Sequence, residues 1–148
     1  MKSIEIRRTV LTTTALPKVF EFLADFTNTN TWDPGTVHTY LIDGDGGVGT
    51  RYANVSRFAG RDVHLTYTVD HYQHEHQIKL RAKNATTTAV DTMTFATTPA
   101  GGTRVIYHAK FTFSGLLALV MPLLTPSFQR LGNRAEHGMQ KALDALEV

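Results

Sequence analysis

Residues 127–146, SFQRLGNRAEHGMQKALDAL, form the stretch that decides the fold of this chain. Its apolar side chains recur at spacings of three and four residues, which predicts an amphipathic helix with one apolar stripe. A helix of about 20 residues spans roughly 30 Å, enough to cross a small domain. The stripe consists of Phe128, Leu131, Ala135, Met139, Ala142 and Leu146. It requires an apolar surface elsewhere in the chain to cover it.

The ends and interior of this helix contain residues with strong local preferences. We expect the helix to begin after Thr125 and Pro126, because threonine caps helices and proline suits a first turn. Gly132 and Gly138 lie inside the helix, and each costs about 1 kcal/mol of helix propensity relative to alanine. Two explanations stay open: the glycines are tolerated weak points, or they allow a bend or a close backbone approach.

The covering surface is expected upstream, where apolar and polar residues alternate with the period of a strand. We predict strands at residues 3–11, 37–42, 50–58, 61–72, 76–83, 86–97 and 103–113, a short helix at 17–25, and a second short helix or a turn at 27–31. Short strands joined by tight turns favour antiparallel pairing with one apolar face. The expected fold class is therefore α+β, in one domain of residues 1–148. A curved seven-stranded antiparallel sheet wraps around the long C-terminal helix.

Composition excludes several functional classes. The 148 residues carry a net charge of +2, and the basic residues are scattered, so no nucleic-acid partner is expected. Cysteine is absent, which excludes disulfides and thiolate chemistry. The N-terminus lacks an apolar signal-peptide core. We therefore expect a cytoplasmic protein.

The most apolar segment, residues 116–124, has nine residues, whereas about twenty are needed to cross a bilayer. No stable membrane insertion is therefore expected. Three roles remain open for the segment: a buried connector, a lid at a cavity mouth, or a surface that touches lipid or another protein. A homodimer is one expected consequence of the last role.

Three short motifs resemble those of a known superfamily. They are VFEFLAD at residues 19–25 followed by WDP at 32–34, the glycine-rich GDGGVGT at 44–50, and GGTRV at 101–105. Together with the element order, they resemble the START-like (SRPBCC) superfamily, whose helix-grip fold is shared by birch-pollen-allergen-like proteins. The resemblance is to its polyketide cyclase/dehydrase-like branch and covers essentially the whole chain. It implies an internal apolar cavity.

The residues predicted to line that cavity lie on the inward faces of the strands and on the helix stripe. They are Trp32, Tyr67, Val69, Ile78, Leu80, Met93, Phe95, Tyr107, Phe111, Phe128, Leu131 and Ala135. Asp91 shares the inward face of residues 86–97, so burial is expected to raise its pKa and make it a candidate general acid or base. His76 shares a face with Ile78 and Leu80 and is the second catalytic candidate. The alternative for both is that a strand end or bulge turns the side chain to solvent.

Two other patterns point to chemistry that the sequence context disfavours. Gly44, Gly46 and Gly49 match the dinucleotide-binding spacing, but a strand follows them instead of the required helix N-terminus. The histidines near residues 71–76 form no spacing typical of a metal site. We therefore expect no metal and no cofactor.

The leading functional prediction is binding of a small hydrophobic or amphipathic ligand, such as a lipid, a polyketide or an aromatic metabolite. The second is a polyketide cyclase/dehydrase-type enzyme that uses general acid–base chemistry, as the resemblance implies. The third is a lipid-handling or stress-related interaction module that uses residues 116–124. Because no acid–base pair is fixed by the sequence, enzymatic activity stays undecided at this level.

Overall fold

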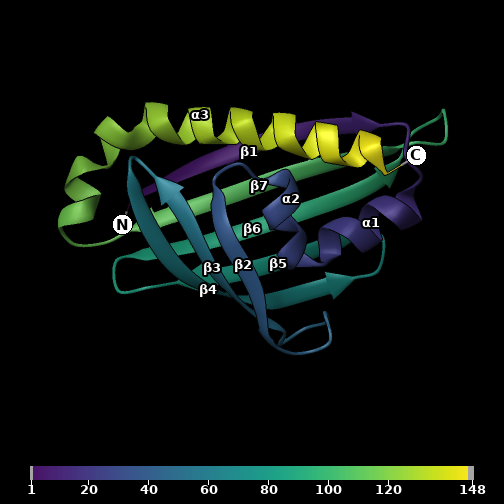
Figure 1. Ribbon diagram of the computed structural model, residues 1–148. Coiled ribbons are helices and arrows are strands. Elements are labelled where there is room, and N and C mark those ends of the chain that lie inside the picture. The colour runs from purple at the N-terminus through teal and green to yellow at the C-terminus, as the bar shows by residue number, and fades with distance from the viewer. Residues whose placement is uncertain (1, 147–148) are drawn as a thin grey trace.

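The computed structural model describes residues 2–146 and contains one antiparallel sheet of seven strands. The strands are β1 (Lys2–Thr12), β2 (Thr36–Asp43), β3 (Arg51–Phe58), β4 (Arg61–Gln73), β5 (Gln77–Lys83), β6 (Thr87–Thr97) and β7 (Thr103–Phe113). Their order across the sheet is β1-β7-β6-β5-β4-β3-β2, so β2 to β7 form a meander and β1 pairs with the last strand. The sheet is strongly curved (Figure 1). This arrangement confirms the fold class predicted from the sequence.

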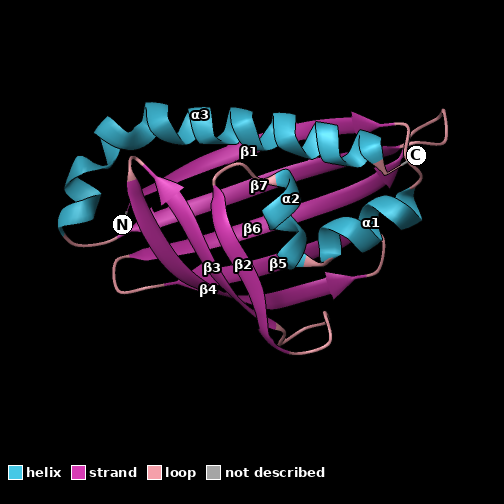
Figure 2. Ribbon diagram, viewed as in Figure 1, coloured by secondary structure: helices cyan, strands magenta, loops and turns pink. Residues whose placement is uncertain are grey.

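Four helical segments accompany the sheet, and Figure 2 shows the helices in cyan. They are α1 (Leu16–Ala24), the 3-10 turn η1 (Phe26–Asn28), α2 (Thr29–Trp32) and the long α3 (Leu116–Ala145). Residues 27–31, left open as a helix or a turn, are therefore helical. Strand β1 and helix α3 lie side by side along one edge of the sheet (Figure 1). Helix α1 covers part of the sheet near β5 and β6 (Figure 1).

The C-terminal helix begins at Leu116, well before the start that the sequence predicted. The predicted start at Thr125 and Pro126 is wrong, because Pro122 and Pro126 both lie inside the helix. Proline removes a helical N–H and bends a helix, and the N-terminal part of α3 is visibly bent (Figure 1). Residues 116–124 are thus the first turns of α3 instead of a separate connector.

Close backbone approach explains both glycines of α3. A Cβ atom at residue 138 would overlap the carbonyl oxygen of Trp32, and one at residue 132 would lie 2.6 Å from Cγ2 of Ile6. Only glycine lets the helix backbone approach this closely. The positions of α2 and β1 against α3 therefore depend on these two residues.

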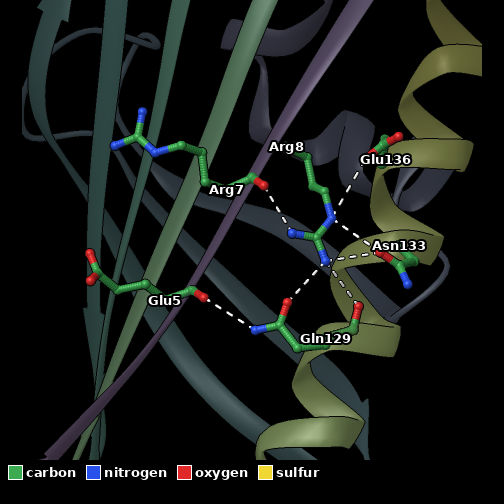
Figure 3. A network of polar contacts seen from close by, with 6 residues as sticks. All are labelled: Glu5, Arg7, Arg8, Gln129, Asn133 and Glu136. Atoms are coloured by element: carbon green, nitrogen blue, oxygen red, sulfur yellow. Dashed lines mark hydrogen bonds and ion pairs between the residues drawn. The ribbon is translucent and has the colours of Figure 1, made fainter.

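The side chain of Arg8 links β1 to α3 by hydrogen bonds (Figure 3). Its guanidinium donates hydrogen bonds to the carbonyl oxygen and Oε1 of Gln129 and to Oδ1 of Asn133, over 2.9–3.2 Å. The same group lies 3.5 Å from the carboxylate of Glu136. Figure 3 also shows that the neighbouring Arg7 points away from the helix. One partly buried side chain therefore holds the middle of α3.

Candidate functional site

The space between the sheet and α3 contains a cavity of about 870 Å³. Ligand pockets in proteins typically measure about 300–1,000 Å³, so this one has room for a molecule of several fused rings. Its apolar wall includes Phe26, Leu65, Phe111, Phe128, Leu131 and Ala135. Phe128 of α3 stacks between strands, with ring centroids 4.1 Å from Phe58 and 4.9 Å from Phe111.

The structure places part of the predicted lining in the cavity wall. These residues are Trp32, Tyr67, Tyr107, Phe111, Phe128, Leu131 and Ala135, and the catalytic candidate Asp91 lies in the same wall. They come from α2, from three strands of the sheet and from the middle of α3. Alternation along the strands and the helical stripe indicated these positions, except for Trp32, which belongs to neither pattern. Their role in ligand binding stays a prediction.

The remaining predicted lining residues lie in the core but outside the cavity wall. They are Val69, Ile78, Leu80, Met93 and Phe95, all nearly inaccessible to solvent. The reason is that α1 packs on the inner face of the sheet at the end away from the cavity. Its Phe20 packs edge-to-face on Phe95 with centroids 5.0 Å apart. The inward face of the strands is thus divided between a packed core and a cavity.

His76 does not share the inward face of β5, which corrects the expectation from the sequence. The residue lies in the turn before β5 and is exposed. Its backbone N–H donates to the carbonyl oxygen of Gln73 over 2.9 Å, and Glu75 in the same turn has a left-handed φ of 58°. The turn directs the imidazole to solvent, away from the cavity.

Asp91 brings a carboxyl group into the cavity wall. The residue is 4% exposed, and its Oδ2 accepts a hydrogen bond from the Tyr107 hydroxyl over 3.3 Å. Its Oδ1 has no hydrogen-bond partner. Burial and, to a lesser extent, the nearby Asp33 carboxyl raise the pKa of Asp91 to about 7, although the Tyr107 hydrogen bond opposes the shift. Near neutral pH this group can therefore both accept and release a proton.

Asp33 is a second carboxyl in the wall, and sequence reasoning missed it. It follows α2 directly and accepts hydrogen bonds from the Gly35 N–H over 2.9 Å and from the Thr36 hydroxyl over 3.3 Å. Burial raises the pKa of Asp33, and these two hydrogen bonds oppose the shift. The available signal was its position immediately after a buried tryptophan at the end of a helix.

Trp32, Tyr67 and Tyr107 add polar groups to the same region. The indole ring of Trp32 meets Tyr107 edge-to-face with centroids 5.7 Å apart, and its Nε1–H has no partner. Burial raises the pKa of both tyrosines well above the ordinary value, and the Asp91 carboxyl adds to the effect. Both phenols therefore stay protonated at neutral pH and can serve as hydrogen-bond donors.

A fully paired polar chain completes the wall on the β2–β3 side, and no pattern in the sequence indicated it. Asn54 donates from Nδ2 to the Thr39 hydroxyl over 2.8 Å, and the Thr29 hydroxyl donates to that same oxygen over 2.7 Å. Ser56 donates to Oδ1 of Asn54 over 2.8 Å. Because these groups satisfy one another, they shape the wall without demanding a ligand.

The mouth of the cavity is marked by wall residues that are also exposed to solvent. They are Arg57, Ala59, Arg61, Asp62, His64, Asn84, Ala85, Thr86 and Val120. They come from the end of β3, the β3–β4 turn, the start of β4, the β5–β6 connection and the first turns of α3. Beside them, Leu116, Leu119 and Leu123 are 74–82% exposed. The apolar start of α3 therefore borders the opening, with Leu117 and Leu124 facing the cavity.

Within residues 2–146, no three histidine, aspartate or glutamate side chains gather in a way that could hold a metal ion. None of the helices described is long and apolar enough to cross a membrane.

A curved antiparallel sheet closed by a long C-terminal helix over an internal cavity defines the START-like, helix-grip class of proteins. The chain belongs to the family described as polyketide cyclase / dehydrase and lipid transport, whose model matches residues 3–147. This confirms the superfamily and the branch that the sequence motifs resemble. A search among curated proteins finds no significant match in sequence.

Solved structures support the same fold. The Zhui aromatase/cyclase from Streptomyces sp. R1128 superposes with a TM-score of 0.84 at 14% identity, over 99% of this chain and 97% of that one. The protein TTHA0849 from Thermus thermophilus gives 0.82 at 15% identity, over 98% and 100%. A START superfamily protein from Mycobacterium smegmatis gives 0.72 at 12% identity, over 95% and 94%. At these identities the likeness concerns the fold alone.

Proposed function

We propose that this protein binds a small hydrophobic or amphipathic molecule, such as a lipid, a polyketide or an aromatic metabolite, inside the cavity. The observation that carries the proposal is the cavity of about 870 Å³ with a mostly apolar wall and a few polar groups at one place. Pockets that bind small molecules have this composition. The family, which includes lipid transport in its description, supports the same class of ligand.

The sole tryptophan of the chain gives a direct assay, because Trp32 lies in the cavity wall. A guest in the cavity should change its emission, and titration with an apolar aromatic probe such as 2-ethylnaphthalene should give a saturable curve. Ala135→Phe, which places a ring in the cavity, should weaken the probe at least fivefold. Ala145→Phe, at an exposed position of the same helix, should leave the curve unchanged. Equal binding by both variants would contradict the proposal.

A second candidate is a cyclase or dehydratase activity on a bound poly-ketone, and Asp91 is the residue that favours it. A catalytic acid or base works best with a pKa near the working pH, and the pKa of Asp91 is about 7. As a carboxylate, it would take a proton from the carbon between two ketones. Once protonated, it would return that proton to a departing hydroxyl group, which leaves as water.

The enzymatic candidate has its own test. Conversion of a linear poly-ketone to an aromatic product, followed by absorbance, should disappear in Asp91→Asn while the naphthalene probe still binds. Unchanged conversion in Asp91→Asn would remove Asp91 from the chemistry. Absence of conversion in the wild type, with probe binding intact, would leave binding as the function.

A further inference from the structure

Six cationic side chains that are scattered in the sequence lie together on the outer face of the sheet, opposite the cavity. They come from β1, β5 and β7 and are Arg7, Lys79, Arg81, Lys83, Arg104 and Lys110. The residue that precedes each of them is buried, so alternation along the strand turns the six side chains outward. Figure 3 shows that Arg7 points away from α3. We call these six residues the cationic face.

The protein itself neutralises little of this charge. Two acids border the cationic face, and each already has a partner: Glu5 pairs with His108 and Asp70 with Arg81, both over 2.9 Å. The other five cations form no ion pair with any side chain in residues 2–146. Because the whole chain has a net charge of only +2, the rest of the molecule is net negative. The positive charge is therefore concentrated on one side of the sheet.

The cations stand on both sides of an uncharged strip formed by the central strand β6. The outward side chains of β6 are Thr88, Val90, Thr92, Thr94 and Ala96. Val90 lies between Arg81 and Lys110, and Lys79 lies opposite Thr92. Neighbouring strands are about 4.8 Å apart, so the cations of β5 and β7 stand about 10 Å apart across the strip. Along β5, each cation follows the previous one at about 7 Å, the length of two residues.

We propose that the cationic face binds an acidic segment of another protein, in extended conformation, that runs along β6. Successive side chains of an extended segment point to opposite sides, and those on one side repeat at about 7 Å. A run of aspartate or glutamate residues therefore presents one row of carboxylates to β5 and another to β7, at the spacing of the cations. The surface lies on the opposite side of the sheet from the cavity, so the proposal is independent of the proposed ligand-binding function.

Other anionic partners fit this surface less well. Glu5 on β1 and Asp70 on β4 border it on both sides, so a wide nucleic-acid duplex would place phosphates against carboxylates. A single nucleic-acid strand binds by stacking its bases on aromatic rings, and the outward residues of β5, β6 and β7 include no Phe, Tyr or Trp. The sheet curves around α3, so its outer face is convex and meets a flat bilayer over a small area only (Figure 1).

Fluorescence anisotropy with a labelled peptide of ten glutamate residues tests the proposal. The wild type should give a saturable curve, and a peptide of ten glutamines with the same label should not bind. Raising the salt concentration from about 0.05 M to about 0.5 M should weaken the acidic peptide at least tenfold, because salt screens exposed charges. A labelled strand of ten thymidines and phosphatidylserine vesicles, measured at the lower salt concentration, should bind more weakly than the acidic peptide.

Charge-reversed variants locate the binding surface. Lys79→Glu combined with Lys110→Glu should weaken the acidic peptide at least tenfold, because attraction is replaced by repulsion on both sides of β6. Arg134→Glu combined with Lys141→Glu is the matched control, since it makes the same change of net charge at exposed positions of α3. That control should bind the peptide within about twofold of the wild type. Lys83→Glu combined with Arg104→Glu repeats the test at exposed positions if the first pair fails to fold.

Three results would overturn the proposal. They are absence of acidic-peptide binding to the wild type, equal weakening by the cationic-face variants and the α3 control, and tighter binding of the thymidine strand or the vesicles than of the peptide. Binding of 2-ethylnaphthalene in the cavity should be the same in all these variants. Failure of the cavity proposal and failure of this one are therefore measured separately.

Discussion

Replacing Asp91 with asparagine should stabilise the protein, and the gain should grow as the pH rises toward neutrality. Burial holds the pKa of Asp91 at about 7 in the folded chain, against 3.8 in the unfolded one. Between these values the folded state retains a proton that the unfolded state has lost. The stability of the wild type therefore falls as the pH rises through this window and levels off above pH 7.

The size of the effect follows from the shift. One pH unit in the window corresponds to about 1.4 kcal/mol, so the burial of ionised Asp91 costs about 4 kcal/mol at pH 8. About 3 kcal/mol of this develops between pH 5 and pH 8. Asparagine does not titrate, so residue 91 gives the Asp91→Asn variant no such dependence of stability on pH. The difference in unfolding free energy between Asp91→Asn and the wild type should widen by that amount over the same range.

Urea unfolding at pH 5, 6, 7 and 8, followed by circular dichroism, measures this difference directly. Asp70→Asn is the matched control, because that carboxylate is exposed and pairs with Arg81 over 2.9 Å. Its difference from the wild type should stay nearly constant. A constant difference for Asp91→Asn as well would refute the description of Asp91 as a buried carboxyl that titrates near neutrality.

Three further predictions concern the frame around the cavity. Arg8→Lys keeps the charge but loses the forked hydrogen bonds to α3, so urea unfolding should show a loss of about 1–2 kcal/mol, whereas Arg7→Lys should change little. Gly138→Ala should lower the unfolding free energy by about 1–2 kcal/mol despite the higher helix propensity of alanine, because its Cβ would meet a carbonyl oxygen of α2. Gly47→Ala, in an exposed loop, is the control and should be near neutral. Equal losses of stability in the two variants would contradict the close approach. The homodimer expected from the apolar start of α3 stays a prediction. Sedimentation equilibrium should show association that Leu119→Lys weakens, and a monomer at all concentrations would refute it.

The sheet and the position of the long helix followed from the sequence because each has a simple period. Alternation in strands such as β7 fixed which side chains face inward, and the three-and-four spacing of residues 128–146 fixed the helix stripe. The start of α3 did not follow, because Pro122 and Pro126 indicate a helix boundary by their local chemistry. Leu116, Leu119 and Leu123 are exposed there, so water can satisfy the carbonyl groups that proline leaves unpaired.

The site was only half predictable for a related reason. The period of a strand separates the inner face from the outer one, but it carries no information about which end of the inner face another element covers. Phe95 and Asp91 belong to the same face of β6, yet α1 packs on the first and leaves the second beside open space. Asp33 entered the site through the docking of α2 against α3, which depends on a contact between residues far apart in sequence.

The central claim is that the space between the sheet and α3 accommodates a guest molecule. A crystal of the protein soaked with 2-bromonaphthalene tests it most directly, because the bromine gives an anomalous difference peak at its own position. We expect the peak inside the cavity, enclosed by Phe128, Tyr107 and Asp91. A peak only on the outer surface, or a cavity closed by rearranged side chains with no peak inside it, would contradict the account.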